Sequence, residues 1–199
     1  MTIINSLPIV AYLLGSVSTA VVVARVLGIQ DPREVGSKNP GATNILRYGG
    51  KLAALLTLAG DLLKGVAAVL IAKALTDDGL VIALSGLAAF VGHLFPVFFR
   101  FRGGKGVATA LGVWLAINPW VGLALVATWL AFAALFRYSS LSALAAAFSA
   151  PFFVAWLIPD VVYLYTCTAM SMLLIVRHRS NIRNLLAGRE SKIGKSRPS

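Results

Sequence analysis

Long apolar stretches, separated by short polar connections, make up most of this chain. About 20 helical residues are enough to cross the hydrocarbon core of a membrane. The apolar pattern predicts seven crossings, at residues 3–25, 52–75, 80–99, 106–118, 120–136, 140–158 and 161–176. The fourth stretch is short, so five crossings with residues 106–158 partly re-entrant are the main alternative. Either way, the sequence predicts an all-α integral membrane protein built as a polytopic helix bundle.

The positive charges fall almost entirely at one set of helix ends. Of the 18 Lys and Arg residues, only Lys64 and Lys73 lie elsewhere. Cytoplasmic loops collect Lys and Arg, so we expect these ends and the C-terminus in the cytoplasm and the N-terminus outside. The net charge of +11 therefore reflects membrane orientation. A nucleic-acid partner is not expected, because the aromatic residues lie within apolar stretches.

The amino-acid composition narrows the class of protein further. With 58% hydrophobic and 13% charged residues, the chain has too little polar surface for a soluble fold. The first apolar stretch runs into Arg25 without a small-residue cleavage site, so we interpret it as a retained helix. Cys167 is the only cysteine, which leaves neither a disulfide nor a cysteine zinc site.

The first polar loop, residues 36–47, combines glycines, short polar side chains and a cation. Its glycines permit close backbone approach, and Arg47 can clamp an anion with two parallel hydrogen bonds. We expect a helix to start at Pro40 with Asn39 as its cap, which would direct backbone N–H groups at an anion. An ordinary capped helix start explains the composition equally well. The candidate binding residues are Ser37, Asn39, Gly41, Thr43, Asn44 and Arg47.

The second polar loop, residues 102–106, places a lysine among glycines directly before an apolar stretch. Backbone N–H groups combined with a lysine commonly form a phosphate cradle. The loop is not a nucleotide P-loop, because that pattern needs Gly where Phe99 stands and Ser or Thr where Gly106 stands. A membrane-boundary turn with snorkelling cations is the alternative. The candidate residues are Gly103, Gly104, Lys105, Gly106 and Thr109.

The third polar segment follows the last predicted crossing. We expect a helix on the inner membrane surface that ends at Gly188. Its apolar face consists of Ile182, Leu185 and Leu186. His178 and Asn181 are three residues apart, so they share a face and can point at one ligand. Beyond this helix, residues 191–199 are interpreted as a basic cytoplasmic tail near anionic lipid headgroups.

Several polar residues fall inside or between the predicted crossings. Asp61 and Lys64 are i and i+3, so we expect an internal ion pair that organises the neighbouring polar loops, although charges inside a membrane often mark function. His93 is expected to be a buried histidine with a partner. Arg137 opens a fourth polar turn, whose candidate anion-binding residues are Ser140 and Ser142.

Taken together, these segments resemble the acyl-phosphate-dependent glycerol-3-phosphate acyltransferases of bacteria, the PlsY family. The resemblance rests on Gly36-Ser37-Lys38-Asn39-Pro40-Gly41-Ala42-Thr43-Asn44 with Arg47, on Gly103-Gly104-Lys105-Gly106-Val107-Ala108-Thr109, and on Arg177-His178 with Asn181, Leu185, Leu186, Gly188 and Glu190. The segments Asp61-Leu62-Leu63-Lys64-Gly65 and Leu14-Gly15-Ser16 are also similar. Lys38 is a departure, because members of the family often carry Gly or a small residue there.

The resemblance implies a small inner-membrane enzyme of lipid metabolism, acting at the first step of phospholipid biosynthesis. Family members transfer a fatty acyl group from acyl phosphate to the 1-hydroxyl of glycerol 3-phosphate, giving lysophosphatidic acid (1-acyl-glycerol 3-phosphate) and phosphate. The implied catalytic residues are Lys105, His178 and Arg47, without a metal or cofactor. Residues 1–190 would form one membrane-embedded catalytic domain with its active site at the cytoplasmic face. The implied partners are the two substrates, membrane lipids and the enzyme that produces acyl phosphate.

The residue types fit that chemistry and leave two questions open. Lys105 and Arg47 can stabilise charge developing on phosphate and on the tetrahedral oxyanion. Either His178 or a substrate phosphate oxygen can take the hydroxyl proton. The His-x4-Asp pair of acyl-CoA-type acyltransferases is absent, because Phe98 and Arg183 stand where its carboxylate would be. The alternatives are a membrane transporter of an organic phosphate, although no internal repeat supports it, and a non-catalytic scaffold that binds lipid.

Overall fold

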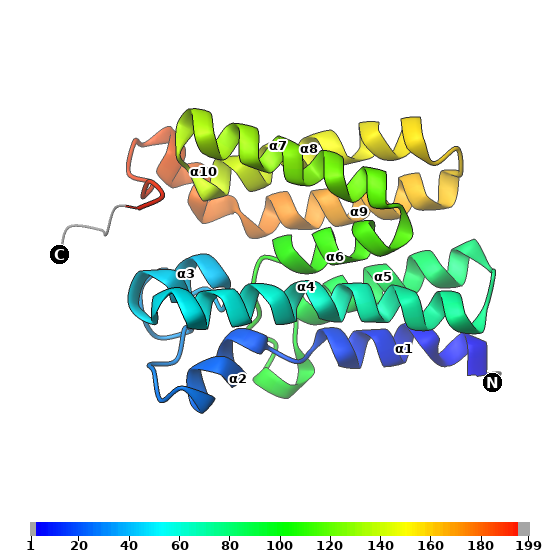
Figure 1. The fold of residues 1–199 in the computed structure, drawn as a ribbon, viewed down its shortest axis with the longest axis horizontal. Coiled ribbons are helices and arrows are strands. Elements are labelled where there is room, and N and C mark those ends of the chain that lie inside the picture. Colours follow the sequence, from blue (N-terminus) through cyan, green and yellow to red (C-terminus); the bar gives the residue numbers. More distant parts are fainter. Residues whose placement is uncertain (1–2, 195–199) are drawn as a thin grey trace. The chain divides into compact units, whose positions relative to one another are not determined.

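A computed structural model describes residues 3–194, and within this range every regular element is a helix (Figure 1). The predicted all-α class is therefore confirmed. The helices group into two compact units, Met1–Ile117 (unit 1) and Asn118–Ser199 (unit 2). Each unit is described by itself below, and the single catalytic domain over residues 1–190 stays a prediction.

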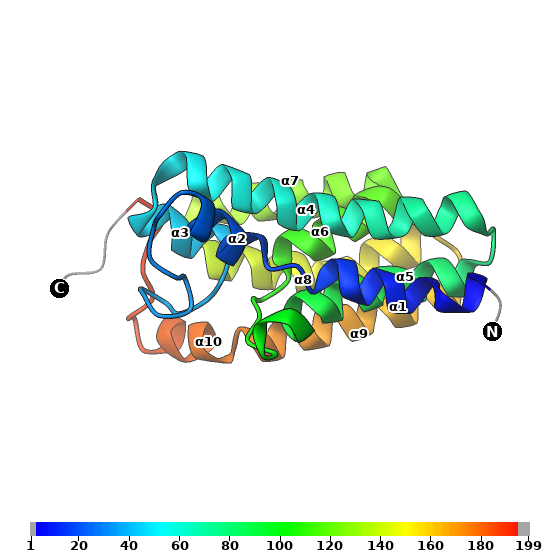
Figure 2. The same ribbon diagram turned by 90° about the horizontal axis from the view of Figure 1, so that it is seen from below.

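Unit 1 is built from close-packed helices. Its elements are α1 (Ile3–Gly15), α2 (Thr19–Val26), α3 (Ala42–Tyr48), α4 (Gly50–Leu75), α5 (Gly79–Leu94), the 3-10 turn η1 (Val97–Phe99) and α6 (Val107–Ile117). Helix α1 lies along α5, and α4 packs against both α5 and α6 (Figures 1 and 2). Glycines permit this proximity, since a Cβ at Gly15 would overlap the backbone of Ala89 and one at Gly112 the backbone of Leu62.

Four helices of the described region are long and apolar enough to span a membrane, and six spans result if each of two bent pairs counts as one. The first predicted crossing is one of these pairs, because α1 and α2 meet at an angle of 41° across a break at residues 16–18. Helix α6 has 11 residues, about 16 Å, and is too short to span alone. Seven crossings therefore stay a prediction, whereas the multi-pass character is confirmed.

Lys73, an exception to the one-sided charge distribution, supports the end of the short helix α6. Its Nζ donates to the carbonyl oxygens of Ala116 and Ile117, at 2.7 and 2.9 Å. The last carbonyls of a helix have no partner within the helix. Lys73 thus satisfies two such groups where α6 ends.

Unit 2 is an antiparallel succession of helices. Its elements are α7 (Pro119–Phe136), α8 (Ser139–Leu157), α9 (Val161–Arg177) and α10 (Arg179–Leu186). Helix α8 packs against α7 and α9. The Asn118 side chain caps α7 by accepting from the backbone N–H groups of Trp120 and Val121, and Pro119 takes the first helical position. Asp160 caps α9 by accepting from the N–H of Val162.

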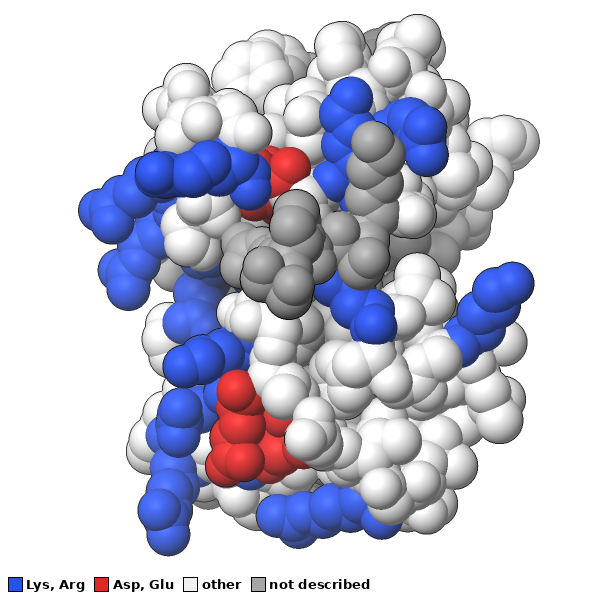
Figure 3. All heavy atoms as spheres, turned by 90° about the vertical axis from the view of Figure 1, so that its left-hand side faces the viewer, with Lys and Arg blue, Asp and Glu red and all other residues white. Residues whose placement is uncertain are grey.

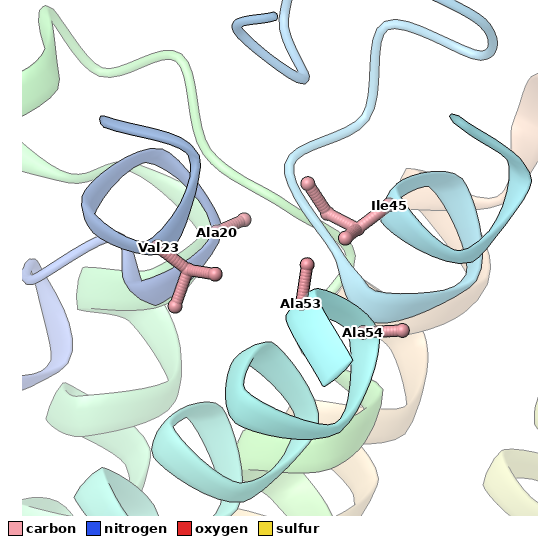
Figure 4. Close-up of a cluster of buried hydrophobic side chains, with 5 residues drawn as sticks. All are labelled: Ala20, Val23, Ile45, Ala53 and Ala54. Atoms are coloured by element: carbon pink, nitrogen blue, oxygen red, sulfur yellow. The ribbon is translucent and has the colours of Figure 1, made fainter. Parts of the chain in front are cut away.

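A small apolar cluster holds the connection between α2 and α4 (Figure 4). Its buried members are Ala20, Val23, Ile45, Ala53 and Ala54. Ile29 and Tyr48 pack against them from the loop and from α3. Because most of these side chains are small, the three helices approach closely and fix both ends of the first polar loop.

Candidate active site

The first polar loop is organised around the buried Asn44 side chain. Its Oδ1 accepts from the backbone N–H of Ser37 at 2.9 Å, and its Nδ2 donates to the carbonyls of Pro32 and Val35 at 3.0 and 3.1 Å. A Cβ at Gly36 would overlap Oδ1, so glycine is needed there. These contacts give Asn44 a positioning role in the loop, while its predicted contact with substrate stays a prediction.

The predicted start of the helix in this loop is wrong by two residues. Helix α3 begins at Ala42 with Gly41 as its N-cap, and no side chain caps it. Asn39 does not act as the cap, because its carbonyl accepts from the N–H of Gly41 in a tight turn that precedes the helix. With seven residues, α3 is short, and the predicted anion binding by this loop stays a prediction.

An ion pair and an aromatic contact fix the segment that leads into the same loop. Arg33 Nη2 lies 2.6 Å from Asp31 Oδ2, and the Arg33 guanidinium lies 5.8 Å from the centre of the Phe99 ring. The side-chain hydrogen bonds from Arg33 hold the pKa of the Asp31 carboxyl below its usual range. Phe99 belongs to η1, so the loop is tied to the segment that precedes the second polar loop.

Cations dominate the surface around this loop. Figure 3 faces the end of unit 1 at which α3 lies. Between residues 25 and 51 the chain carries five Lys and Arg residues and two acidic residues. Ser37, Thr43 and Arg47 are exposed there. Lys38 is also exposed and has a left-handed backbone, with φ of 56°, a conformation that glycine adopts without strain.

The second polar loop is the most tightly enclosed backbone of the candidate site. Gly103, Gly104 and Gly106 are buried, and Lys105 is half-buried. A Cβ at Gly103 would overlap the carbonyl oxygens of His93 and Leu94, and one at Gly106 the Phe90 ring. Gly106 has a φ of 83° and leads directly into α6, as predicted. Lys105 is therefore held just before a helix N-terminus.

This loop also meets the first loop. A Cβ built on Gly104 would lie 3.0 Å from the carbonyl oxygen of Pro40. Thr109, predicted as a binding residue, is fully buried and donates to the Asp61 carbonyl at 2.9 Å. That contact places Thr109 in the support of the loop, and its contact with substrate stays a prediction.

In unit 2, His178 lies at the sharp bend between α9 and α10. The two helices meet at 58°, and His178 is 2% exposed. Its Nδ1 lies 2.8 Å from the carbonyl oxygen of Leu174. A carbonyl can only accept, so Nδ1 carries the proton, and in the neutral ring Nε2 carries the lone pair. Helix α10 ends at Leu186, and Gly188, two residues on with a φ of 66°, terminates it as predicted.

Glu190 joins two of the predicted site residues and was not itself predicted as a site residue. Its Oε1 accepts from Ser140 Oγ at 2.8 Å and from Asn181 Nδ2 at 2.7 Å. Ser142 is buried and donates to the carbonyl of Tyr138, the N-cap of its helix. Two sequence signals pointed to Glu190: its place in the third motif of the resemblance, and its being a lone carboxylate in a segment otherwise full of Arg and Lys.

The start of the predicted tail is bound to unit 2 rather than fully solvated. The N–H of Ile193 donates to the Arg137 carbonyl at 2.6 Å, and Lys192 Nζ lies 5.6 Å from the centre of the Tyr138 ring. The predicted tail residues from 195 onward lie outside the described residues.

Apolar helices joined by basic, glycine-rich loops define this chain as a polytopic membrane protein. The profile of one family, glycerol-3-phosphate acyltransferase, matches residues 6–188. The chain belongs to the glycerol-3-phosphate acyltransferase family. The prediction of a glycerol-3-phosphate acyltransferase is thereby confirmed.

Relatives match over nearly the whole chain. The glycerol-3-phosphate acyltransferase of Methylococcus capsulatus is 59% identical over 188 residues, 94% of each chain. That of Burkholderia pseudomallei (strain K96243) is 57% identical over 192 residues, 95% of each chain. Two crystal structures of PlsY (YgiH), an integral membrane glycerol 3-phosphate acyltransferase, are also similar. The glycerol 3-phosphate form has a TM-score of 0.91 at 44% identity and covers 96% of both chains. The lysophosphatidic acid form has a TM-score of 0.89 at 43% identity, covering 96% of this chain and 95% of the other.

Proposed function

We propose that this chain transfers a fatty acyl group from acyl phosphate to the 1-hydroxyl of glycerol 3-phosphate. The hydroxyl oxygen attacks the acyl carbonyl carbon, the bond from that carbon to the phosphate oxygen breaks, and phosphate leaves. The products are lysophosphatidic acid and inorganic phosphate. Acyl phosphate is a mixed anhydride with a good leaving group, so the reaction requires positioning and charge stabilisation above all.

The observation that carries this proposal is the enclosed glycine loop with Lys105 directly before α6. Backbone N–H groups at a helix start, next to a lysine, favour phosphate. Lys105 would stabilise the charge that develops on the leaving phosphate or on the oxyanion. Arg47 would add a second cation from the neighbouring first loop, in which Ser37, Asn39, Gly41 and Thr43 would serve as substrate ligands. The glycerol 3-phosphate form of the related PlsY supports phosphate recognition by this family.

His178 and Asn181 of unit 2 would take part in the same reaction. The His178 tautomer leaves Nε2 with the lone pair, which suits it to orient or deprotonate the glycerol hydroxyl. A phosphate oxygen of a substrate is the other proton acceptor. Asn181 and Ser140, both held by Glu190, would bind polar groups of a substrate, and Ser142 would support them.

The same proposal includes a location in the cell. An odd number of crossings with the basic loops inside would place these residues at the cytoplasmic face of a bacterial inner membrane. The acyl chain would then stay in the bilayer while its phosphate reaches the basic loops. Delivery by the enzyme that makes acyl phosphate would fit this arrangement.

A donor-comparison assay tests the proposal. Purified protein in lipid is given glycerol 3-phosphate with either palmitoyl phosphate or palmitoyl-CoA, without added metal, and phosphate and lysophosphatidate are measured together. Turnover with palmitoyl phosphate alone is expected. Lys105→Ala should reduce kcat roughly 100-fold, whereas Lys51→Ala, an exposed lysine at the start of α4, should not.

Other outcomes of this assay contradict separate parts of the proposal. Equal turnover with palmitoyl-CoA contradicts the donor. Absence of turnover with both donors, in folded protein, contradicts acyl transfer and favours movement of an organic phosphate across the membrane, which uptake of glycerol 3-phosphate into proteoliposomes would reveal.

A further inference from the structure

Three titratable side chains meet in the interior of unit 1. Lys64 Nζ lies 2.9 Å from Asp61 Oδ1, which confirms the predicted pair, and His93 Nδ1 lies 3.4 Å from the same oxygen. Each of the three residues is at most 7% exposed. Asp61 and Lys64 come from α4, and His93 comes from the last turn of α5. We call these three residues the buried triad.

The buried triad contacts the break between α1 and α2 and the start of α6. Lys64 Nζ also donates to the carbonyl of Val17, at 2.8 Å, in the unwound segment that separates α1 from α2. The backbone carbonyl of Asp61 accepts from Thr109 Oγ1 in the first turn of α6. The triad residues are thus bonded to the helix that follows the glycine loop.

His93 connects the triad to the glycine loop itself. Its backbone carbonyl accepts from the N–H of Gly104 at 3.1 Å. A Cβ on Gly104 would overlap Nε2 of the same histidine, so the ring edge opposite Asp61 lies directly against the loop. The His93 ring therefore lies between Asp61 and the loop, and its orientation determines how much space the backbone beside Lys105 has.

We propose that Asp61, Lys64 and His93 are positioning residues that hold the Gly103–Gly106 loop, and with it Lys105, in the geometry that phosphate recognition requires. The inference rests on the function proposed above. Charges inside a membrane are expensive, and apolar residues of similar volume would join the helices at lower cost. The close contacts of Asp61 with Lys64 and with His93, unlike apolar packing, favour one orientation of the His93 ring and of the backbone that lies against it.

The central test removes both charges of the triad together. Asp61→Asn/Lys64→Met leaves no unpaired buried charge, so its melting temperature should stay close to that of the unchanged protein. Its kcat for acyl transfer should fall roughly 10- to 100-fold with little change in KM, because Lys105 is displaced from the transition state. Thr57→Val and Ser85→Ala are matched controls, since these buried hydroxyls bond only within α4 and α5, and kcat should not change.

Amide hydrogen exchange provides a readout that does not depend on turnover. In the double variant and in His93→Asn, the amides of residues 103–106 should exchange at least tenfold faster, while those of α7 and α8 do not change. If the unchanged protein lacks acyl transfer from acyl phosphate, the proposed function fails, yet the exchange comparison still tests the triad. The inference is overturned if the double variant keeps the kcat and loop protection of the unchanged protein. The single variant Lys64→Met gives a second way to overturn it. If this variant loses activity only because it unfolds, and the double variant recovers both folding and activity, the inference is overturned as well.

Discussion

The two polar loops of unit 1 have similar compositions but are held in place by different means. The first loop is fixed by bonds between residues close in sequence, because Asn44 reaches back to residues 32–37 and, just before the loop, Arg33 pairs with Asp31. The second loop makes its key contacts with residues of α5, and the triad behind His93 extends to α4. Its glycines leave no room for any side chain.

This difference has a consequence for function. A loop closed by local side chains can keep groups such as Arg47 exposed at the surface, where they can adjust to a substrate. A loop packed against a buried histidine has little conformational freedom. That rigidity suits a lysine whose task is to stabilise charge that develops at one defined position in the transition state. The two loops can be tested separately, by substitutions that disturb either the local hydrogen bonds of the first loop or the packing of the second loop against α5.

The largest effect is expected from adding one carbon atom to the second loop, and the same change in the first loop serves as the comparison. Gly103→Ala would force a methyl group into the carbonyl oxygens of His93 and Leu94, which cannot move without shifting α5. We expect a loss of roughly 2–4 kcal/mol of stability and a nearly inactive protein. Gly41→Ala meets only the end of the Asn39 side chain at 2.9 Å and should stay folded. Thermal unfolding in detergent measures the stability of both variants. Equal destabilisation by Gly103→Ala and Gly41→Ala would contradict the difference in how the two loops are supported.

The next effect concerns the local support of the first loop. Asn44→Ala removes three hydrogen bonds and leaves the N–H of Ser37 and two carbonyls to find other partners. We expect roughly 2–3 kcal/mol of destabilisation, together with reduced turnover. Asn39→Ala in the same loop serves as the control and should alter turnover with little change in melting temperature. An Asn44→Ala protein as stable as the unchanged one would contradict the positioning role.

A third, smaller effect is expected in unit 2, where Glu190 plays the part that Asn44 plays in the first loop. Glu190→Ala releases both Ser140 and Asn181 and should lower kcat/KM roughly tenfold. Glu190→Gln keeps an oxygen that can accept from both and should retain most of the activity. Steady-state kinetics at varied glycerol 3-phosphate concentration gives kcat/KM for the two variants and the unchanged protein. Equal losses in the two variants would show that the negative charge matters rather than the two hydrogen bonds.

The smallest effect should come from the partly exposed pair Asp31–Arg33. Arg33 lowers the pKa of Asp31 in the folded protein, so the pair stabilises the fold above the ordinary Asp pKa and loses this contribution as the pH falls below about 4. Arg33→Gln should cost less than about 1 kcal/mol at pH 7. The melting temperatures of the two proteins should differ by a constant amount above about pH 4 and converge as the pH falls from there. A difference that stays constant as the pH falls would assign the effect to the Phe99 contact instead.

The sequence by itself determined the membrane class, the chain positions of most helices and the residues of the polar loops. Apolar length and charge distribution depend only on the local chain, and three motifs in order were specific enough to indicate the family. The pairing of Asp61 with Lys64 also followed from helical spacing, since residues three apart share a face.

Only the tertiary structure decided which residues support the loops. Nothing in the local sequence connects His93 to Asp61 and Gly104, or Glu190 to Ser140, because these contacts join residues 11 to 50 positions apart. The start of α3 was misplaced for a related reason. Asn39 has the composition of a cap, but the bonds that Asn44 makes to residues 32–37 hold the chain in another turn until Gly41. Local preferences amount to tenths of a kcal/mol up to about 1 kcal/mol each, so buried hydrogen bonds override them wherever the fold brings distant groups together.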